Sequence, residues 1–519
     1  MLNRSENIRD EYCAQIVRIG KLEPIENSDF LAKTYVNNAY QVVVGKNDVK
    51  EGDIMVYCKL ETAINDQFLS VNNQYEIGER QRNSNAKEVE QLILEGKTDE
   101  AKKMVGYFNK HGRVRIVKLR GVASEGCLFN LESLYRWNSK LRHIDFEQYI
   151  NVDENGNIIP FNFDTIDGKL FIQAYVPATP EIGSGKSRRN KKRDAKIKKF
   201  DRMIEGQFAF HYDTNQLTDN IWKFNPETDI TVTNKLHGTS HIVANILTRK
   251  PIPATIARKI VNKQKKRELA MLRKAPKRYY WQRAENKLKT NRIKKYFDDQ
   301  YSIEYGKVTS SRTIIKNKYI NEKVGPGFYK IDVWSYYGDI LYPFLDKGMT
   351  VYSEIVGYLP DSNTMIQKGY DYGCVPGTSF IMPYRITMTD EKGIHIEWEV
   401  KDVYKWTINL INKYPSLKNV VVPIEIFYQG KVKDLYPNIP IDENYGKNLI
   451  AEFRADKEHF GMEENEPRCK NKVPREGIVV RISNSPLAQA FKLKTFAYLG
   501  KEAKEIDNGN VDIEMQITY

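Results

Sequence analysis

A lysine in the second half of the chain stands where it could act as a nucleophile. Lys235 follows the alternating segment Asp229–Asn234 and precedes Gly238, so we expect it at the end of a strand beside a tight turn. A lysine held there becomes nucleophilic when desolvation or nearby cations lower its pKa. Its attack on the α-phosphate of a nucleotide would give a phosphoramidate and release pyrophosphate. The alternative is an ordinary surface lysine, and Lys235 alone does not exclude it.

Carboxylates stand in two further segments with the pattern of strands. Alternation places Glu354 on one face of its strand together with Tyr352 and Val356. Glu476 opens the apolar segment Gly477–Ile482. A buried carboxylate at the end of a strand is costly unless it is paired, and a divalent cation is a natural partner for it.

Near the C-terminus, two lysines alternate with two apolar residues. The period of two places Lys492 and Lys494 on one face of a strand, and Phe491 and Leu493 on the other. Two cations that converge on a phosphate would neutralise the charge that develops during phosphoryl transfer. Simple solvation of an edge strand produces the same alternation, so this segment alone does not indicate a phosphate-binding site.

In their order along the chain, these segments resemble motifs I, III, IV and V of the covalent nucleotidyltransferases. That superfamily contains RNA ligases, DNA ligases and mRNA capping enzymes, which all form a lysine–nucleotide intermediate. The resemblance implies that Lys235 is the nucleophile, that Glu354 binds the nucleotide ribose and that Glu476 binds the metal. It also implies that Lys492 and Lys494 bind phosphate groups. The residues that carry it are Lys235–Ser240, Tyr352–Gly357, Arg475–Val480 and Phe491–Lys494.

Two weaker matches add an arginine and an aromatic residue. The segment that ends in Arg312 resembles motif Ia, which implies a contact of Arg312 with the nucleotide or the 5′-phosphate end. Tyr384 falls where motif IIIa should supply an aromatic ring that stacks on adenine. A surface arginine and a core tyrosine are the alternatives at these two positions.

Motif I departs from the superfamily pattern at one position. The pattern is written KxDG, and this chain has His237 in place of the aspartate, followed by Gly238, which we count among the nucleotide-binding residues. A histidine could orient the loop, but it does not supply the same fixed negative charge. His237 and His241 have the spacing of a metal-binding pair on a helix, but Gly238 and the strand-like surroundings argue against that interpretation.

The elements around these motifs predict an α+β protein with two domains. Residues 1–160 read as short alternating strands with a helical insertion near residues 78–106, which favours an OB-like β-barrel over a generic all-β module. Residues 205–519 would form an adenylyltransferase domain built on antiparallel sheets with helical insertions. The expected strands of the first domain are Gln15–Ile19, Tyr40–Val44, Asp53–Tyr57 and Val114–Gly121.

Two basic stretches interrupt this plan. Residues 161–204 form a basic linker, in which Gly183–Ser187 looks like the end of a P-loop but lacks the first glycine of that motif. The second is a helix-forming insertion near residues 251–297, where aromatic residues among the cations could stack on bases or pack the insertion onto the body. Those aromatic residues are Tyr279, Tyr280 and Trp281.

Composition indicates a nucleic-acid-binding protein of the cytoplasm. The chain has 519 residues and a net charge of +14, and such a charge favours a polyanionic partner, with nucleic acid preferred to a membrane surface. We find no apolar run of transmembrane length and no signal peptide. The five cysteines form no CxxC pair, which argues against a zinc site and for a reducing compartment.

The layout resembles one clade, the ATP-dependent RNA ligases with an N-terminal OB module. About 25 residues follow Lys494, too few for the C-terminal OB domain of DNA ligases and capping enzymes. The resemblance implies a lysyl-AMP intermediate, a need for ATP and Mg²⁺ or Mn²⁺, and sealing of RNA 5′-phosphates to 3′-hydroxyls at nicks in duplex RNA or RNA–DNA hybrid. The alternatives are a DNA ligase, a capping-type enzyme, or a degenerate protein that binds nucleic acid. The segments that carry this comparison are Gln41–Lys46, Val117–Gly121 and Gly206–Thr214.

Overall fold

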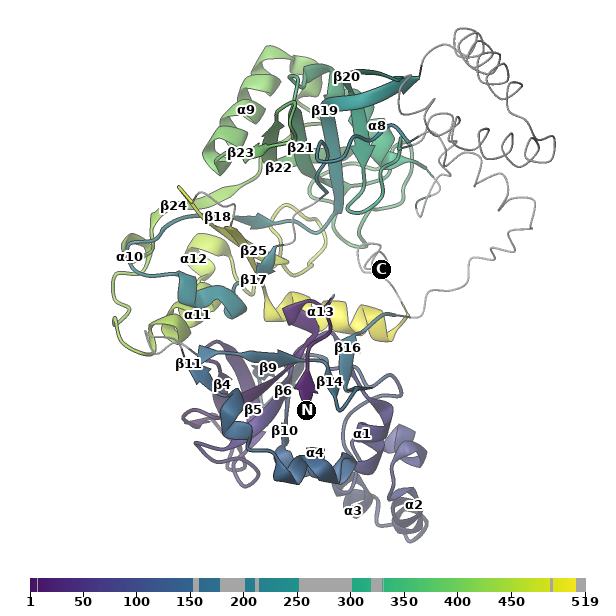
Figure 1. The fold of residues 1–519 in the computed structure, drawn as a ribbon, viewed down its shortest axis with the longest axis vertical. Coiled ribbons are helices and arrows are strands. Elements are labelled where there is room, and N and C mark those ends of the chain that lie inside the picture. Colours follow the sequence, from purple (N-terminus) through teal and green to yellow (C-terminus); the bar gives the residue numbers. More distant parts are fainter. Residues whose placement is uncertain are drawn as a thin grey trace, which may run out of the picture.

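The structure is a computed structural model that describes residues 1–6, 8–152, 158–177, 201–210, 214–251, 301–318, 329, 331–485 and 489–509. Most of the basic linker, with its Gly183–Ser187 segment, lies outside the described residues, and so does the basic insertion from residue 252 onward. In Figure 1 an N-terminal module lies at one end of the molecule and an α+β body at the other, with helix α13 (Phe496–Asp507) between them.

The N-terminal module consists of short, mostly antiparallel strands. Its largest sheet has the order β10-β6-β2-β13, with the bounds Cys127–Asn130, Ile54–Cys58, Ala14–Arg18 and Phe161–Phe163. A second sheet contains β3 (Glu23–Pro24), β4 (Leu31–Val36) and β5 (Tyr40–Gly45). Smaller ladders pair β1 (Leu2–Asn3) with β14 (Thr165–Ile166) and β15 (Lys169–Leu170), β7 (Thr62–Ile64) with β16 (Ile172–Ala174), β8 (Val117–Leu119) with β9 (Val122–Ser124), and β11 (Asn151–Val152) with β12 (Ile158–Ile159).

The helical insertion expected in this module is present. Three short helices follow β7, namely α1 (Asp66–Val71), α2 (Ala86–Leu94) and α3 (Thr98–Lys103), and α4 (Leu131–Trp137) follows β10. Helices α2 and α3 lie within the expected span, and α1 precedes it, where Phe68 packs edge-on against Phe129 and Phe171 in the core of the module. Strands within residues 161–174 also pair with this module, beyond the expected boundary at residue 160.

The body contains two five-stranded sheets. The first has the order β17-β26-β25-β18-β24, with the bounds Asn215–Gln216, Gln489–Lys494, Gly477–Ile482, Asp229–Lys235 and Ile426–Lys431. The second has the order β20-β19-β21-β22-β23, with the bounds Tyr301–Ser310, Thr239–Pro251, Met349–Gly357, Ser379–Thr389 and His395–Glu397. All these neighbours are antiparallel except β17 and β26. The predicted α+β class is therefore confirmed.

Helices flank the two sheets, as Figure 1 shows. They are α8 (Val333–Leu341), α9 (Val400–Lys413), α10 (Val432–Leu435), α11 (Tyr445–Ala455) and α12 (Lys457–Phe460). The chain passes from the first sheet to the second through residues 236–238, between β18 and β19. The first candidate motif thus lies at the junction of the two sheets.

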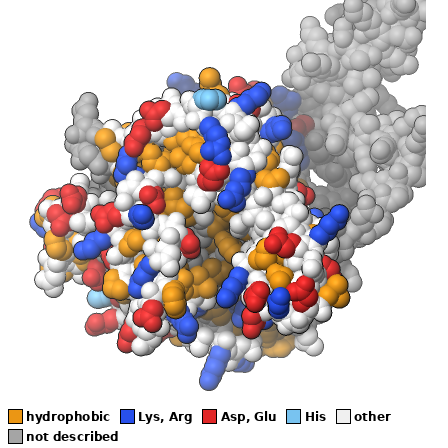
Figure 2. All heavy atoms as spheres, turned by 90° about the horizontal axis from the view of Figure 1, so that it is seen from below, with side chains coloured by type: hydrophobic (Ala, Val, Ile, Leu, Met, Phe, Trp, Pro, Cys, Tyr) orange, Lys and Arg blue, Asp and Glu red, His pale blue; other side chains and the backbone are white. Residues whose placement is uncertain are grey.

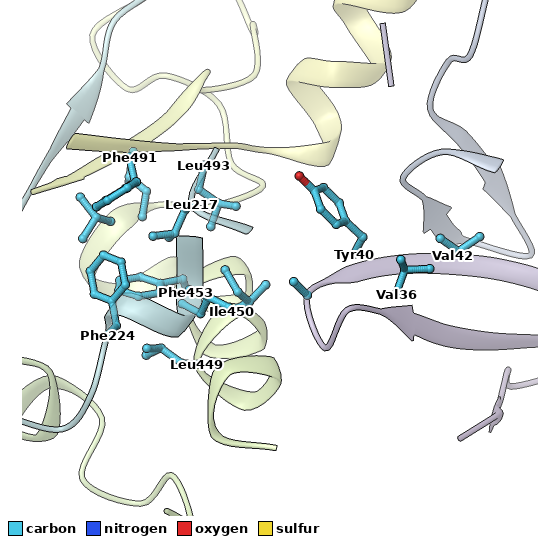
Figure 3. Close-up of a cluster of buried hydrophobic side chains, with 14 of the residues drawn as sticks. Val36, Tyr40, Val42, Leu217, Phe224, Leu449, Ile450, Phe453, Phe491 and Leu493 are labelled. Atoms are coloured by element: carbon cyan, nitrogen blue, oxygen red, sulfur yellow. The ribbon is translucent and has the colours of Figure 1, made fainter. Parts of the chain in front are cut away.

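The module and the body share one hydrophobic core. Phe491 and Leu493 point away from the lysine face of β26, are almost fully buried, and pack in a cluster that also holds Val36 and Tyr40 of the module (Figure 3). Because this contact is apolar and shared, the module is packed against the sheet that carries Lys492 and Lys494. The predicted alternation of β26 is confirmed.

On the face shown in Figure 2, Lys and Arg side chains interleave with Asp and Glu side chains. The described residues of this face therefore do not form a single basic patch. None of the helices that the structure describes is long and apolar enough to cross a membrane.

Candidate active site

Every residue that the sequence analysis proposed for the site lines the same cavity. The cavity has a volume of about 280 Å³ and lies where the two sheets of the body, the N-terminal module and α13 meet. Its walls include nine predicted residues that lie up to 259 positions apart in the sequence: Lys235, His237, Gly238, Arg312, Glu354, Tyr384, Glu476, Lys492 and Lys494.

Strand register places two of the lysines on either side of one glycine. Lys235 at the end of β18 lies opposite Gly477 of β25, and Gly477 lies opposite Lys494 of β26. Gly477 has a φ of +149°, and a Cβ atom there would lie 2.0 Å from the Leu493 carbonyl oxygen. Only glycine fits such a position, so the two lysines flank a point of the sheet that has no room for a side chain.

Glu476 forms a short ion pair with the expected nucleophile. Its Oε1 lies 2.7 Å from Lys235 Nζ and 3.9 Å from Lys494 Nζ, and its side chain is 5% exposed. A buried carboxylate needs such compensation, because burial removes its hydration. From the sequence we expect a metal ion as the partner of Glu476, and in the structure Lys235 pairs with it.

The residues around Glu476 are compatible with a divalent ion held mostly by other oxygens. No group of three or more His, Cys, Asp and Glu side chains suited to a metal occurs among the described residues. Mg²⁺ is often bound through one or two carboxylates, with substrate phosphates and water completing its shell. Glu476 fits that mode as a single protein ligand.

Each lysine of β26 faces a carboxylate from another element. Lys492 Nζ lies 3.4 Å from Glu11 Oε2, where Glu11 belongs to a short 3-10 turn of the N-terminal module. Burial lowers the pKa of Lys492 despite Glu11, and Lys494 lowers it further. Burial would also lower the pKa of Lys494, but Glu502 and Glu476 outweigh it, so that pKa is raised.

His237 is buried in a cage of tyrosines. Its Nδ1 lies 3.0 Å from the Tyr498 hydroxyl, its backbone N–H donates to the Tyr372 hydroxyl over 2.8 Å, and its ring meets Tyr370 edge-on. Burial lowers the pKa of His237 to about 3, and Lys501, Lys235 and Lys494 act in the same direction against Glu502. The histidine is therefore neutral at pH 7, and it does not replace the charge of an aspartate.

The spacing of His237 and His241 does not produce a metal pair. His241 is fully buried in the second sheet, where its Nδ1 lies 2.9 Å from Ser353 Oγ and its Nε2 lies 3.1 Å from the Trp334 carbonyl oxygen. His241 is a core histidine with both ring nitrogens hydrogen-bonded.

Gly238 joins the first motif to the strand of Glu354. The Gly238 N–H donates to Glu354 Oε1 over 3.1 Å, and a Cβ atom at Gly238 would lie 2.3 Å from the Ile355 carbonyl oxygen. Gln367 Nε2 donates to the Gly238 carbonyl over 2.8 Å. This close approach of the backbones holds Glu354 next to the turn that follows Lys235.

Tyr384 reaches the cavity through an irregularity in its strand. In the pairing of β21 with β22, Tyr352 lies opposite Arg385 and Ser353 lies opposite Pro383, which leaves Tyr384 as the extra residue of a bulge. Bulges change the direction of a side chain relative to the sheet. Arg312, just beyond the end of β20, lies on the same cavity.

Comparison with known proteins supports an OB fold for the N-terminal module. A family model described as an OB-fold domain matches residues 13–106. The N-terminal module is an OB fold.

Solved structures of an RNA ligase are similar to this chain. A lysine-to-alanine variant of Naegleria gruberi RNA ligase with ATP and Mn is 14% identical, with a TM-score of 0.46, over 94% of this chain and 98% of that one. The same ligase with PPi is also 14% identical, with a TM-score of 0.46, over 96% of this chain and 100% of that one. None of the curated proteins compared with the chain matches its sequence. A likeness of this size assigns no activity to the chain.

The structure adds residues that sequence reasoning missed. The OB module contributes charged and aromatic side chains to the cavity wall, and α13 contributes a tyrosine and a carboxylate. No local pattern marks them, because contacts such as Glu11–Lys492 join residues 481 positions apart. The added residues are Arg9, Glu11, Tyr12, Lys59, Tyr498 and Glu502.

Proposed function

We propose that this protein is an ATP-dependent RNA ligase. One observation carries the proposal: Lys235 Nζ lies 2.7 Å from Glu476 in a cavity that is also lined by Lys492 and Lys494. A nucleophilic lysine, a carboxylate and two further cations are the groups that nucleotidyl transfer to lysine requires. The other expected nucleotide contacts, among them Glu354 and Tyr384, lie on the same cavity.

In the first step, Lys235 Nζ attacks the α-phosphorus of ATP. The new bond joins Nζ to phosphorus, the bond from the α-phosphorus to the bridging oxygen of the β-phosphate breaks, and pyrophosphate leaves. The lysine must lose a proton for this attack, and the Glu476 oxygen at 2.7 Å is placed to take it. Lys492 and Lys494 would bind the phosphate oxygens, where negative charge grows as pyrophosphate departs.

The next two steps transfer AMP and seal the strand. A 5′-phosphate oxygen of the RNA attacks the phosphorus of lysyl-AMP, the phosphorus–nitrogen bond breaks, and Lys235 is regenerated. The 3′-hydroxyl then attacks the activated 5′-phosphate, AMP leaves, and a phosphodiester is formed. Arg312 lies on the cavity wall, where it would contact the nucleotide or the 5′-phosphate.

A divalent ion, Mg²⁺ or Mn²⁺, would shield phosphate charge when bound. Glu476 is the residue that would hold it, with the remaining positions filled by phosphate and water oxygens. Tyr384 would stack on the adenine, and Glu354 would bind the ribose, each from its place on the cavity wall.

The OB module would position the broken duplex. OB folds bind oligonucleotides, and in this chain the module itself forms part of the cavity wall through Arg9, Tyr12 and Lys59. A nick whose 5′-phosphate enters the cavity would thus contact the module and the body together. We propose nicks in duplex RNA or RNA–DNA hybrid as the substrate.

A sealing assay tests this proposal. Nicked duplexes with an RNA 3′-hydroxyl strand, a DNA 3′-hydroxyl strand or DNA throughout are incubated with ATP or GTP and either Mg²⁺ or Mn²⁺. We expect ATP-dependent sealing of the nick with an RNA 3′-hydroxyl strand. Efficient sealing of the all-DNA nick would instead indicate a DNA ligase, and a reaction with GTP would indicate a capping-type enzyme. Binding of the duplexes without any nucleotidyl transfer would indicate a degenerate binding protein.

A further inference from the structure

Helix α13 places a carboxylate beside the second lysine of β26. Glu502 Oε1 and Oε2 lie 2.9 Å and 3.0 Å from Lys494 Nζ, so both oxygens accept hydrogen bonds from one ammonium group. Glu502 is one helical turn after Tyr498, and residues four apart share a helix face. The face of α13 toward the cavity therefore holds Lys494 with Glu502 and His237 with Tyr498.

The helix itself is fixed at both ends. At its start, Thr495 Oγ1 accepts from the Tyr498 N–H over 3.1 Å, and Glu463 accepts from the Ala497 N–H over 3.0 Å. At its end, Arg113 of the OB module lies 3.3 Å from the Ala503 carbonyl oxygen and 3.3 Å from Asp507. A side chain on this helix can therefore hold a neighbour in one place, since its backbone is held from both domains.

Neighbouring lysines stabilise the negative charge of Glu502. Burial would raise the pKa of Glu502, but Lys494 outweighs burial, and Lys235 acts in the same direction as Lys494, so that the pKa is lowered. Glu502 is thus ionised at pH 7, whereas His237 is neutral. Of Glu502 and His237, only Glu502 on α13 therefore carries a negative charge.

Without Glu502, Lys494 would have Glu476 as its neighbouring carboxylate. Lys494 Nζ is already 3.9 Å from Glu476 Oε1, the atom that Lys235 contacts at 2.7 Å. A released Lys494 would move toward that oxygen and compete with Lys235 for it. In the structure the two oxygens of Glu502 instead accept hydrogen bonds from the Lys494 ammonium group at a shorter distance than Glu476.

We propose, on the basis of the ligase function above, that Glu502 is a positioning residue for Lys494. It holds the ammonium group at the cavity and supplies from α13 the negative charge that an acidic residue at position 237 would bring. Glu502 acts through Lys494 and does not itself contact the nucleotide.

The experiment compares self-adenylylation of the full chain with Glu502→Gln, which keeps the shape of the side chain and removes its charge. Rates are measured against ATP concentration, so that kcat and KM separate. We expect kcat and kcat/KM to fall together by about tenfold, because an interaction needed in the transition state is lost. Glu502→Asp, which keeps the charge, should recover part of that loss. The matched control is Glu505→Gln on the same helix, where the carboxylate pairs with Lys501.

A charge-relocation variant makes the test specific. In the Glu502→Gln background, His237→Asp should raise kcat at least about threefold, since a carboxylate would again stand near Lys494. Equal rates for Glu502→Gln and the unmodified chain would overturn the proposal alone, because labelling itself would persist. If Glu502→Gln does not fold, Glu502→Met, which also removes the charge, replaces it in the test, and an unchanged kcat in that folded variant would overturn the proposal. No labelling of the unmodified chain would overturn the ligase function and this proposal together.

Discussion

Lys235 and Lys494 flank the same glycine. Both lie opposite Gly477, one on β18 and the other on β26, so their backbones are two strands apart across the first sheet of the body. The residue before that glycine, Glu476, contacts the first lysine at 2.7 Å and approaches the second to 3.9 Å. The candidate nucleophile, the carboxylate and a phosphate-binding lysine are therefore fixed by the register of three adjacent strands.

Gly477→Ala should destabilise the protein and abolish its activity. The new Cβ atom would lie 2.0 Å from the Leu493 carbonyl oxygen, in a backbone conformation with a φ of +149°. We expect a loss of at least about 2 kcal/mol in the free energy of unfolding, measured by urea denaturation.

Gly500→Ala is the matched control for that variant. Gly500 lies inside α13, and no atom lies within 4 Å of a Cβ atom built there. Alanine favours a helix over glycine, so this variant should be stabilised by about 0.5–1 kcal/mol. Equal stability of Gly477→Ala and the unmodified chain would show that β25 and β26 do not approach each other as described.

Tyr384→Ala should weaken the use of ATP, whereas Tyr384→Phe should not. Stacking of an aromatic ring on a base contributes about 1–3 kcal/mol, so we expect KM for ATP in self-adenylylation to rise about tenfold with alanine. The control is Tyr404→Ala on the outer side of α9. If KM is unchanged in Tyr384→Ala, the ring at the bulge does not contact the base.

Arg113→Met should destabilise the junction of the OB module with α13. The Arg113 side chain is fully buried, lies 2.8 Å from Glu61 and 3.3 Å from Asp507, and its loss leaves both carboxylates without this partner. Removing one side of a buried ion pair costs about 3–5 kcal/mol, measured here as the free energy of unfolding.

Arg142→Met serves as the comparison for that junction. Arg142 pairs with Glu132, and both side chains are about half exposed, so its replacement should cost less than about 1 kcal/mol. A loss of similar size in the two variants would show that Arg113 does not join the two domains.

Stability should fall in mild acid because of a buried histidine. Burial lowers the pKa of His241 to about 4, although the Trp334 carbonyl and Asp332 oppose it. An unfolded chain, with a histidine pKa of about 6.5, then binds more protons than the folded chain, so the free energy of unfolding decreases as pH falls from 6.5 to 4. Full loss of this contribution corresponds to about 3 kcal/mol.

The measurement for that effect is the slope of unfolding free energy against pH. His241→Gln should show a shallower slope between pH 6.5 and 4 than the unmodified chain, because it removes the titrating group. His143→Gln, at an exposed position, should leave the slope unchanged. A slope that His241→Gln does not alter would contradict the burial of a neutral histidine in the second sheet.

Local patterns in the sequence were sufficient to predict the strands that carry Lys235, Lys492 and Lys494. The alternation of residues 491–494 predicted which side chains of β26 enter the core and which face the cavity, because the period of a strand fixes both. The end of β18 at Lys235 was predictable for a similar reason, since the alternating segment stops just before a glycine turn. Strand-level features of the site were therefore visible in the sequence.

Contacts between segments that lie far apart in the sequence could not be predicted from local patterns. Tyr384 reaches the cavity through a bulge, which depends on the register between two strands and leaves no clear mark in the sequence of either. Glu502 and Glu11 belong to elements whose role depends on how α13 and the OB module pack on the first sheet. Tertiary packing decides which carboxylates meet the two lysines, so reading single segments could not identify them.

Labelling of the protein by ATP tests the central claim most directly. The chain is incubated with α-labelled ATP and Mg²⁺ or Mn²⁺, and the labelled peptide is mapped, alongside Lys235→Ala and the control Lys405→Ala at an exposed position of α9. We predict a covalent AMP adduct on Lys235 in the unmodified chain and in Lys405→Ala, with none in folded Lys235→Ala. An adduct that persists in Lys235→Ala, or the absence of any adduct with either metal, would contradict the assignment of Lys235 as the nucleophile.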